Sequence, residues 1–461
     1  MEIEVGRGKG LRTVRSKLPE ALVFILILFV FFCSNAASGE SRASSLLAVP
    51  PFLGRPSQNS ITINLVTGEK DIMCQIRYRP SEQADASDWK ITTDFPVDAF
   101  TAEEVKLDSL FGGRGYEYQV YARPRDSETF QMLSEHRFRT KASNPPSFSF
   151  AILSDSHITP FHKERLDILS QASESILIRR PDFFFMLGDN IQTFTSHGGP
   201  MTEERFGPLL YSLLRRGLGA TPSSVPGFLV IGNWEGENGW HPETERRWAA
   251  KARRAFIPNP GPDTYTEGGG EKGDYYGFTW GEVLFLVLNV TGYTLTDHTH
   301  GSRVGNADDW TLGERQKEWL LGQLSRSTAR WKLLFIHHTV GGKAGDDLNS
   351  RYGRGGGRAA HVGEQALIHQ WMREHGVQAL FYGHDHVFTD MEVEGIHYIC
   401  VGSAGAPWKF TEAETGYSRY WTPSGYTWVD VAKDSLKVSF VEPGSGETGD
   451  RIMHSFLIHG R

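Results

Sequence analysis

The chain has 461 residues, of which 39% are hydrophobic and 22% are charged, and its formal net charge is −7 at pH 7. This composition is typical of a folded protein and excludes a largely disordered one. The acidic balance leaves no basic excess for neutralising phosphates, so we expect no nucleic-acid partner. Three cysteines exclude a disulfide scaffold, and the length predicts one large domain with a smaller one.

Residues 1–39 have the pattern of a secretory signal peptide. Basic side chains in residues 1–19 precede an uninterrupted apolar run at 21–32, and small residues follow. The apolar run is shorter than the roughly 20 residues that span a bilayer. We therefore predict cleavage near Ala36 or Gly39 and a secreted or periplasmic protein. The alternative is an uncleaved signal anchor, and only then would a membrane be a partner.

Residues 46–142 are predicted to form a small all-β sandwich. Short runs that mix β-branched and apolar residues with polar ones are separated by turn residues, without helical periodicity. These runs are 60–66, 71–78, 104–110, 116–123 and 136–140. The stretch VKLDSLFGGRGYEYQVYARP resembles the end of a fibronectin type III domain. The resemblance implies a tyrosine corner made by Tyr116 or Tyr118.

A stiff linker, Asn144-Pro145-Pro146, precedes a stretch in which apolar strands alternate with helical segments. Helices are predicted at 163–179, 314–326 and 364–374, and this alternation indicates an α/β domain. Five apolar runs each end in polar residues; they are 147–153, 182–187, 227–231, 332–336 and 378–382.

The polar residues after these runs are candidate metal ligands. They are Asp155, His157, Asp189, Asn233, His337, His384 and His386. In α/β sheets, ligands bind beyond the carboxyl ends of strands, so we expect these side chains to share one rim. Carboxylates, imidazoles and an amide without a thiolate favour Fe, Zn or Mn. Seven candidates exceed the needs of one ion and predict two, roughly 3.5–4 Å apart, that share a carboxylate.

Five motifs along the chain resemble, in type and in order, those of the calcineurin-like metallophosphoesterases. They are Asp-x-His, Gly-Asp, Gly-Asn, a strand-borne His and Gly-His-x-His. With the preceding sandwich, the chain resembles their purple acid phosphatase branch. The resemblance implies that residues 146–461 form a double β-sandwich flanked by helices, with a dinuclear metal centre at its edge. It implies hydrolysis of a small phosphate ester by attack of a metal-bridging hydroxide.

The resemblance also implies a role for each candidate ligand. One ion would be held by Asp155, His157 and His386, and Asp189 would bridge to the second. The second ion would be held by Asn233, His337 and His384. Asp189, Asn233 and His384 are the residues that we expect to be catalytic.

Two positions depart from the family pattern. Trp234 stands where the family has a substrate-facing His after Gly-Asn, and an indole cannot supply a proton near neutral pH. The acid must then come from elsewhere, be unnecessary, or be absent, and His241, His298 and His300 are loop candidates for it. Gln192 stands where purple acid phosphatases have a tyrosinate on Fe(III), so we expect no purple colour.

A glycine-rich segment at 341–358 contains Arg351 and Arg354, which could bind a phosphate group or belong to a surface loop. These features together predict an exported phosphatase that acts on phosphate monoesters. The alternatives are a phosphodiesterase for nucleotide or lipid head-group esters, and a metal-binding member with little or no catalysis.

Overall fold

The computed structural model describes residues 46–82, 89–193, 206–296, 310–339, 363–407, 417, 419–444 and 449–460. The predicted signal peptide lies outside these residues. So do His298, His300, Arg351 and Arg354. Among the described residues, no helix is both long and apolar enough to cross a membrane.

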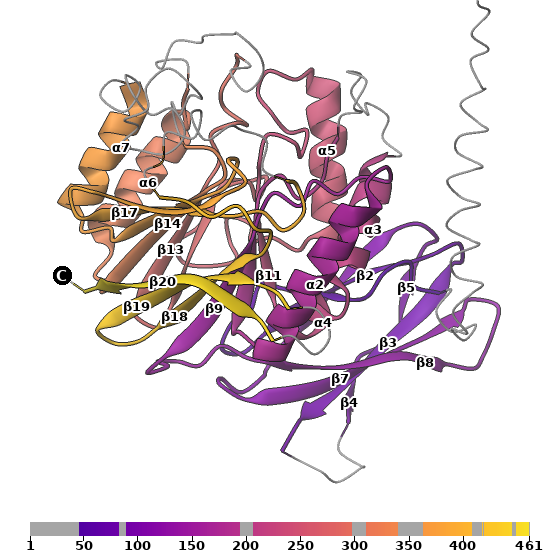
Figure 1. Ribbon diagram of the computed structural model, residues 1–461. Coiled ribbons are helices and arrows are strands. Elements are labelled where there is room, and N and C mark those ends of the chain that lie inside the picture. The colour runs from indigo at the N-terminus through magenta and orange to yellow at the C-terminus, as the bar shows by residue number, and fades with distance from the viewer. Residues whose placement is uncertain are drawn as a thin grey trace, which may run out of the picture. The chain divides into compact units, whose positions relative to one another are not determined.

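The first part of the described chain is a small all-β sandwich (Figure 1). One sheet has the order β1 (Phe52–Gly54), β2 (Ile61–Val66), β6 (Ala102–Leu107). The other has the order β4 (Lys90–Ile91), β3 (Ile72–Pro80), β7 (Gly115–Pro124), β8 (Gln131–Arg139), with β5 (Phe95–Val97) also paired to β3. The Tyr116 hydroxyl accepts a hydrogen bond from the Phe111 N–H at 2.8 Å, while Tyr118 contacts the following domain.

Two six-stranded sheets follow among the described residues. The first has the order β11 (Gly227–Val230), β10 (Phe183–Leu187), β9 (Phe148–Leu153), β18 (Tyr426–Val431), β19 (Ser435–Glu442), β20 (Arg451–His459). The second has the order β12 (Tyr276–Trp280), β13 (Val283–Leu288), β14 (Trp331–Ile336), β15 (Ala379–Tyr382), β17 (Ile396–Val401), β16 (Phe388–Val393). In each sheet, the strands that precede candidate ligands run parallel to one another.

The two sheets pack face to face through large apolar side chains. The rings of Phe185 on β10 and Phe335 on β14 stack with centroids 4.2 Å apart. Phe150 on β9 meets Phe285 on β13 edge to face, at 5.4 Å. These four side chains are fully buried in the cluster between the sheets, and burial of such rings contributes strongly to core stability.

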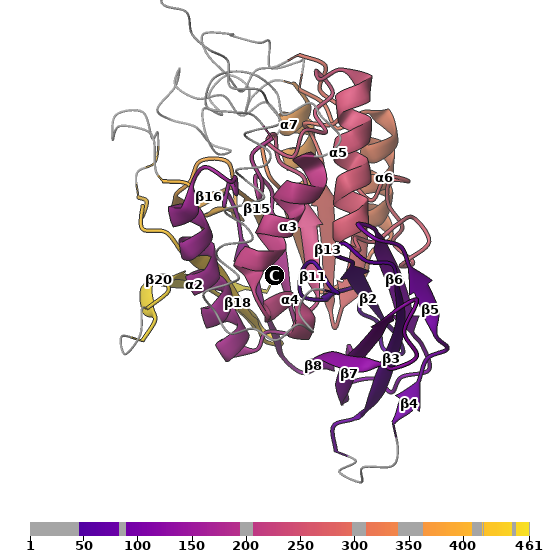
Figure 2. The same cartoon turned by 90° about the vertical axis from the view of Figure 1, so that its right-hand side faces the viewer.

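Helices cover the outer faces of both sheets. On the first sheet's side lie α2 (Lys163–Arg179), α3 (Phe206–Leu218) and α4 (Thr221–Ser224), with α5 (Glu243–Phe256) against α3 (Figure 2). On the second sheet's side, α6 (Glu314–Arg326) and α7 (Gly363–Glu374) bury leucine and methionine side chains against β13 and β14. The predicted fold class, a helix-flanked double β-sandwich after a small all-β sandwich, is confirmed.

A buried arginine joins the small sandwich to the larger domain. Arg215 on α3 is fully buried, and its guanidinium donates to Asn64 Oδ1 at 2.5 Å, to Asn64 O at 3.1 Å and to Pro50 O. It also donates to Phe256 O at 3.2 Å. Because the acceptors on Asn64 and Phe256 are buried, these hydrogen bonds offset the cost of burying the charge.

Replacing Arg215 with alanine is expected to lower the free energy of unfolding by about 3 kcal/mol, because hydrogen bonds to a charged group contribute about 1.5–3 kcal/mol and unsatisfied buried acceptors add to the loss. Chemical denaturation of both proteins measures the difference. Arg216→Ala is the matched control, since this neighbouring side chain is exposed and donates to Ala48 O at the surface. Equal losses for both variants would contradict the role given to Arg215.

Candidate metal centre

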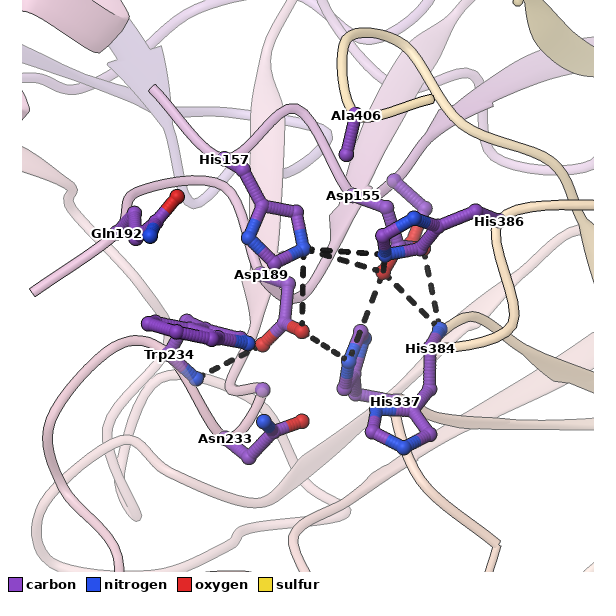
Figure 3. Close-up of polar contacts among 12 residues, drawn as sticks. Asp155, His157, Asp189, Gln192, Asn233, Trp234, His337, His384, His386 and Ala406 are labelled. Atoms are coloured by element: carbon purple, nitrogen blue, oxygen red, sulfur yellow. Dashed lines mark hydrogen bonds and ion pairs between the residues drawn. The ribbon is translucent and has the colours of Figure 1, made fainter. Parts of the chain in front are cut away.

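The candidate ligands lie at the carboxyl ends of five strands. Asp155 and His157 follow β9, Asp189 follows β10, and Asn233 follows β11, all in the first sheet. His337 follows β14, and His384 and His386 follow β15, in the second sheet. Figure 3 shows these side chains close together. The parallel arrangement of the strands explains the convergence, because parallel strands end on the same side of a sheet.

The first group of side chains is Asp155, His157 and His386. One ligand atom from each lies within 4.8 Å of the others, and all three residues are buried. The Nε2 atoms of the two histidines are 3.2 Å apart. Nε2 of His386 is also 3.4 Å from Asp155 Oδ1. Two imidazole nitrogens and a carboxylate oxygen this close together could hold a single cation.

The second group is Asp189, His337 and His384, which satisfy the same distance limit. Nε2 of His337 lies 3.0 Å from Asp189 Oδ2. The same Oδ2 atom lies 3.5 Å from Nε2 of His157 in the first group. Oδ2 of Asp189 thus comes within 3.5 Å of an imidazole nitrogen of each group, as a bridging ligand must, whereas Asp155 Oδ1 lies 3.8 Å from His337 Nε2.

Asn233 lies beside Asp189 (Figure 3). Its side chain is buried, and its Oδ1 atom has no hydrogen-bond partner among the described residues. An unsatisfied buried amide oxygen costs roughly 1–3 kcal/mol. A cation would satisfy this oxygen, so Asn233 fits the family's two-ion centre together with the two groups.

The surroundings of two histidines select the nitrogen that faces the centre. Nδ1 of His337 donates to Leu187 O at 2.7 Å, and Nδ1 of His386 donates to Pro407 O at 3.0 Å. With the proton held on Nδ1, each Nε2 presents its lone pair to the centre. This is the usual arrangement of a metal-binding imidazole, whose second nitrogen donates to the protein.

The electrostatics of the two groups favour a cation at their centre. Burial acts to raise the pKa of Asp155, but His337 and His386 outweigh it and hold the pKa below its ordinary value. Burial acts to lower the pKa of His337, but the carboxylates of Asp189 and Asp155 raise it to about 10. The clustered carboxylates therefore attract a proton to His337 Nε2, and a bound cation would replace that proton.

The backbone at these positions is unusual. Left-handed conformations occur at five of the seven candidate ligands: Asp155, His157, Asp189, His384 and His386 have φ between 45° and 72°. Such conformations are uncommon for residues other than glycine, and they concentrate at functional sites. At Gly188, with φ of 86°, a Cβ atom would lie 2.5 Å from the His337 ring, so only glycine allows this close packing.

The other residues predicted from the sequence lie outside the two groups. Trp234 is half-buried, and its ring meets the His157 ring edge to face with centroids 5.5 Å apart. Gln192 accepts a hydrogen bond from Arg165 at 2.7 Å. His241 is half-buried, with Nδ1 3.4 Å from Gly236 O, and the structure does not bring it into either group. Asp385, between the ligands His384 and His386, is buried and accepts a hydrogen bond from Tyr417.

Several residues around the ligands were not predicted from the sequence. Ser154 Oγ donates to Asp155 Oδ2 at 2.7 Å. In the loop after β17, the Ala406 N–H donates to Asp155 O at 2.9 Å. Glu235 is fully buried and accepts hydrogen bonds from the loops that hold Asp189 and Asn233. A charged residue directly after a metal-ligand motif is the one sequence signal that could have pointed to Glu235.

Comparison with known proteins places this geometry in a family. The sequence model of the calcineurin-like phosphoesterases matches residues 148–388, which is just over half of the chain. The chain belongs to the calcineurin-like phosphoesterase family. Family membership makes it a metal-dependent phosphoesterase, and the matched region contains all seven candidate ligands. No curated protein matches the sequence.

Two solved structures share the fold of this calcineurin-like phosphoesterase. The structure of PhoD is similar with a TM-score of 0.67 at 14% identity, and the match covers 92% of each chain. The structure of the purple acid phosphatase PPD1 from yellow lupin (Lupinus luteus) seeds is similar with a TM-score of 0.62 at 14% identity. That match covers 89% of this chain and 74% of PPD1. The similarity in both cases extends well beyond the region matched by the family model.

Proposed function

We propose that the chain is an exported phosphatase that hydrolyses small phosphate monoesters at a dinuclear metal centre. The observation that supports this most is the position of Asp189, whose Oδ2 atom lies 3.5 Å from His157 Nε2 and 3.0 Å from His337 Nε2. One carboxylate thus serves both groups of ligands. The name of the similar lupin structure, an acid phosphatase, supports monoesters. The signal-like residues 1–39 support export.

The ligands divide between the two ions as the geometry groups them. Asp155, His157 and His386 would hold one ion, and Asn233, His337 and His384 would hold the other. Bound ions of the Fe, Zn or Mn class supply Lewis acidity and an activated water for attack on phosphorus. The Nδ1 hydrogen bonds of His337 and His386 fix their rings before any substrate binds.

Trp234 is the residue of this centre that we expect to face the leaving group. The ring lies beside the ligand His157, on the same loop as Asn233 (Figure 3). An indole offers an aromatic surface and one N–H donor, without a titrating group. Esters of acidic alcohols, such as phenols, need little protonation as they leave, and they suit a centre built in this way.

A comparison of two aryl esters tests the substrate class. The mature protein should hydrolyse 4-nitrophenyl phosphate with a kcat/KM at least about tenfold above that for bis(4-nitrophenyl) phosphate, a difference of about 1.4 kcal/mol in transition-state binding. The opposite preference would identify a phosphodiesterase. If the metal-loaded wild type hydrolyses neither ester faster than a variant that lacks a metal ligand, the protein binds metal without catalysis.

The metal content is a separate prediction. Seven converging ligands should hold about two ions of Fe, Zn or Mn per chain. Elemental analysis of protein purified without chelator measures this ratio. An active protein with a reproducible ratio of one or less would contradict the dinuclear centre. An optical spectrum of the same sample should show no purple charge-transfer band, because Gln192 stands in the position of the tyrosinate.

A further inference from the structure

A fully buried carboxylate lies between the loops that hold Asp189 and Asn233. Oε2 of Glu235 accepts hydrogen bonds from the Asp189 N–H at 3.0 Å and from the Gly232 N–H at 2.7 Å. Oε1 accepts from the Asn190 N–H at 2.8 Å and from Asn190 Nδ2 at 3.1 Å. These four donors satisfy both oxygens, and hydrogen bonds to a charged acceptor are stronger than those to a neutral one.

The four donors belong to two different strand ends. Asp189 and Asn190 follow β10, whereas Gly232 follows the neighbouring strand β11. The two ends are in close contact, because a Cβ atom on Gly232 would lie 2.3 Å from Asp189 Oδ1. The Trp234 N–H donates to that same oxygen at 2.8 Å. Glu235 therefore joins the two ends through main-chain groups, and only Oδ2 of Asp189 is left to face the imidazoles.

The conformation of Asp189 requires such support. Its φ of 50° lies in the left-handed region, which is unfavourable for an L-residue because Cβ comes too close to the following carbonyl oxygen. A strained backbone conformation of this kind persists only where contacts with neighbouring groups hold it in place. The Glu235 carboxylate binds the N–H groups of Asp189 and of the next residue, so it opposes relaxation of this turn. The burial of a second negative charge near Asp189 is itself unfavourable, so stability alone does not account for Glu235.

We propose that Glu235 is a positioning residue for the metal ion held by Asn233, His337 and His384. It fixes the turn that aims Asp189 Oδ2 and the spacing between Asp189 and Asn233. The first group, Asp155, His157 and His386, is held by other contacts, among them those of Ser154 and the loop after β17. Loss of Glu235 should therefore weaken the second ion more than the first, because the first ion keeps Asp155, His157 and His386. This inference rests on the two-ion centre proposed above.

The test is a metal titration of Glu235→Gln, with Glu235→Asp beside it. Glutamine has the same shape as glutamate, but its side-chain N–H₂ group cannot accept a hydrogen bond from a main-chain N–H. We expect one of the two dissociation constants to rise by about 10–100-fold, the range for residues that support metal ligands. The other constant should change much less. Calorimetric titration of metal-free protein with Zn²⁺ measures both constants without any assay of activity.

Asp182→Asn is the matched control. Asp182 precedes the other end of β10, and its carboxylate also accepts a main-chain hydrogen bond, from the Ser149 N–H at 3.1 Å. Its conversion to an amide should leave both constants unchanged. Glu235→Asp keeps the charge but shortens the side chain, so it should fold and show a smaller selective loss. This variant decides the question if Glu235→Gln does not fold.

Two results would overturn the inference. In one, a folded Glu235 variant binds both ions as tightly as the wild type. In the other, both constants weaken equally while thermal stability falls, which would make Glu235 a residue of the fold alone. A wild type that binds two ions without hydrolysing phosphate esters would instead contradict the proposed function. In that case, the two metal dissociation constants would still test the role of Glu235.

Discussion

Asp189→Ala is expected to lower phosphate-ester turnover by roughly 10³-fold or more, because the carboxylate that lies closest to the imidazoles of both groups is lost. The variant should also bind less than the wild-type complement of metal. Its fold should persist, because the phenylalanine-rich core between the sheets does not include Asp189. Kinetics with 4-nitrophenyl phosphate, elemental analysis and circular dichroism measure these three properties.

The left-handed backbone at Asp189 calls for a second variant. Alanine disfavours φ near 50°, so part of any effect could come from a distorted turn. Asparagine tolerates this conformation and has the size of aspartate, so Asp189→Asn removes the charge with the least change of backbone. Both variants should lose turnover. Asp108→Ala, at an exposed position in the small sandwich, is the control that should change nothing. Full metal loading with wild-type activity in Asp189→Asn would remove Asp189 from the centre.

Trp234→His is expected to raise kcat/KM for alkyl phosphates more than for aryl phosphates. A positioned general acid contributes about 10²–10⁴-fold, mostly where the leaving group is poor. The wild type has no such acid at this position, so its rate should fall steeply as the pKa of the leaving alcohol rises. The variant should show a flatter dependence across a series of phosphate monoesters.

The main chain around Trp234 makes this substitution interpretable. The Trp234 N–H donates to Asp189 Oδ1 at 2.8 Å, and the Trp234 carbonyl accepts from Thr193 Oγ1 at 2.8 Å. These contacts do not depend on the side chain. Trp234→Phe is the control, because it removes the N–H and reduces the ring without adding an acid. If Trp234→Phe flattens the dependence as much as Trp234→His, the gain comes from space and not from proton transfer.

A flat dependence in the wild type would show that another acid already operates. His241 would then be the first residue to mutate, followed by His298 and His300. The structure leaves His241 outside both ligand groups, and the other two lie outside the described residues.

Locally periodic segments could be predicted from the sequence with little error. The helices expected at 163–179 and 314–326 have the bounds of α2 and α6. The apolar runs before the candidate ligands became β9, β10, β11, β14 and β15 within a residue or two at each end. In such segments the spacing of apolar side chains along the chain is itself the signal.

Contacts between distant segments could not be predicted in the same way. β18 pairs with β9, with Thr427 opposite Ile152, and β19 and β20 extend the same sheet. Nothing near Thr427 in the sequence indicates that partner. For the same reason, the sequence does not indicate that the Ala406 N–H donates to the Asp155 carbonyl oxygen. Pairing of this kind depends on the packing of the whole domain.

The same distinction applies to the residues of the candidate metal centre. Ligand side chains such as Asp155 and His386 follow recognisable motifs, because metal chemistry limits the residue types that can serve. Glu235 has a different role, since it binds main-chain N–H groups, which every sequence offers. Its role depends on the ends of β10 and β11 lying side by side, which the sequence does not indicate. Predictions for Arg351 and Arg354 stay untested, because both lie outside the described residues.

The central claim is that two ions, joined by Asp189, are required for hydrolysis. The most direct measurement adds Zn²⁺ or Mn²⁺ stepwise to metal-free mature protein and follows hydrolysis of 4-nitrophenyl phosphate. Turnover should stay near background during the first equivalent and reach its plateau at about two equivalents. Full turnover at one equivalent, or turnover that does not depend on metal, would contradict the claim.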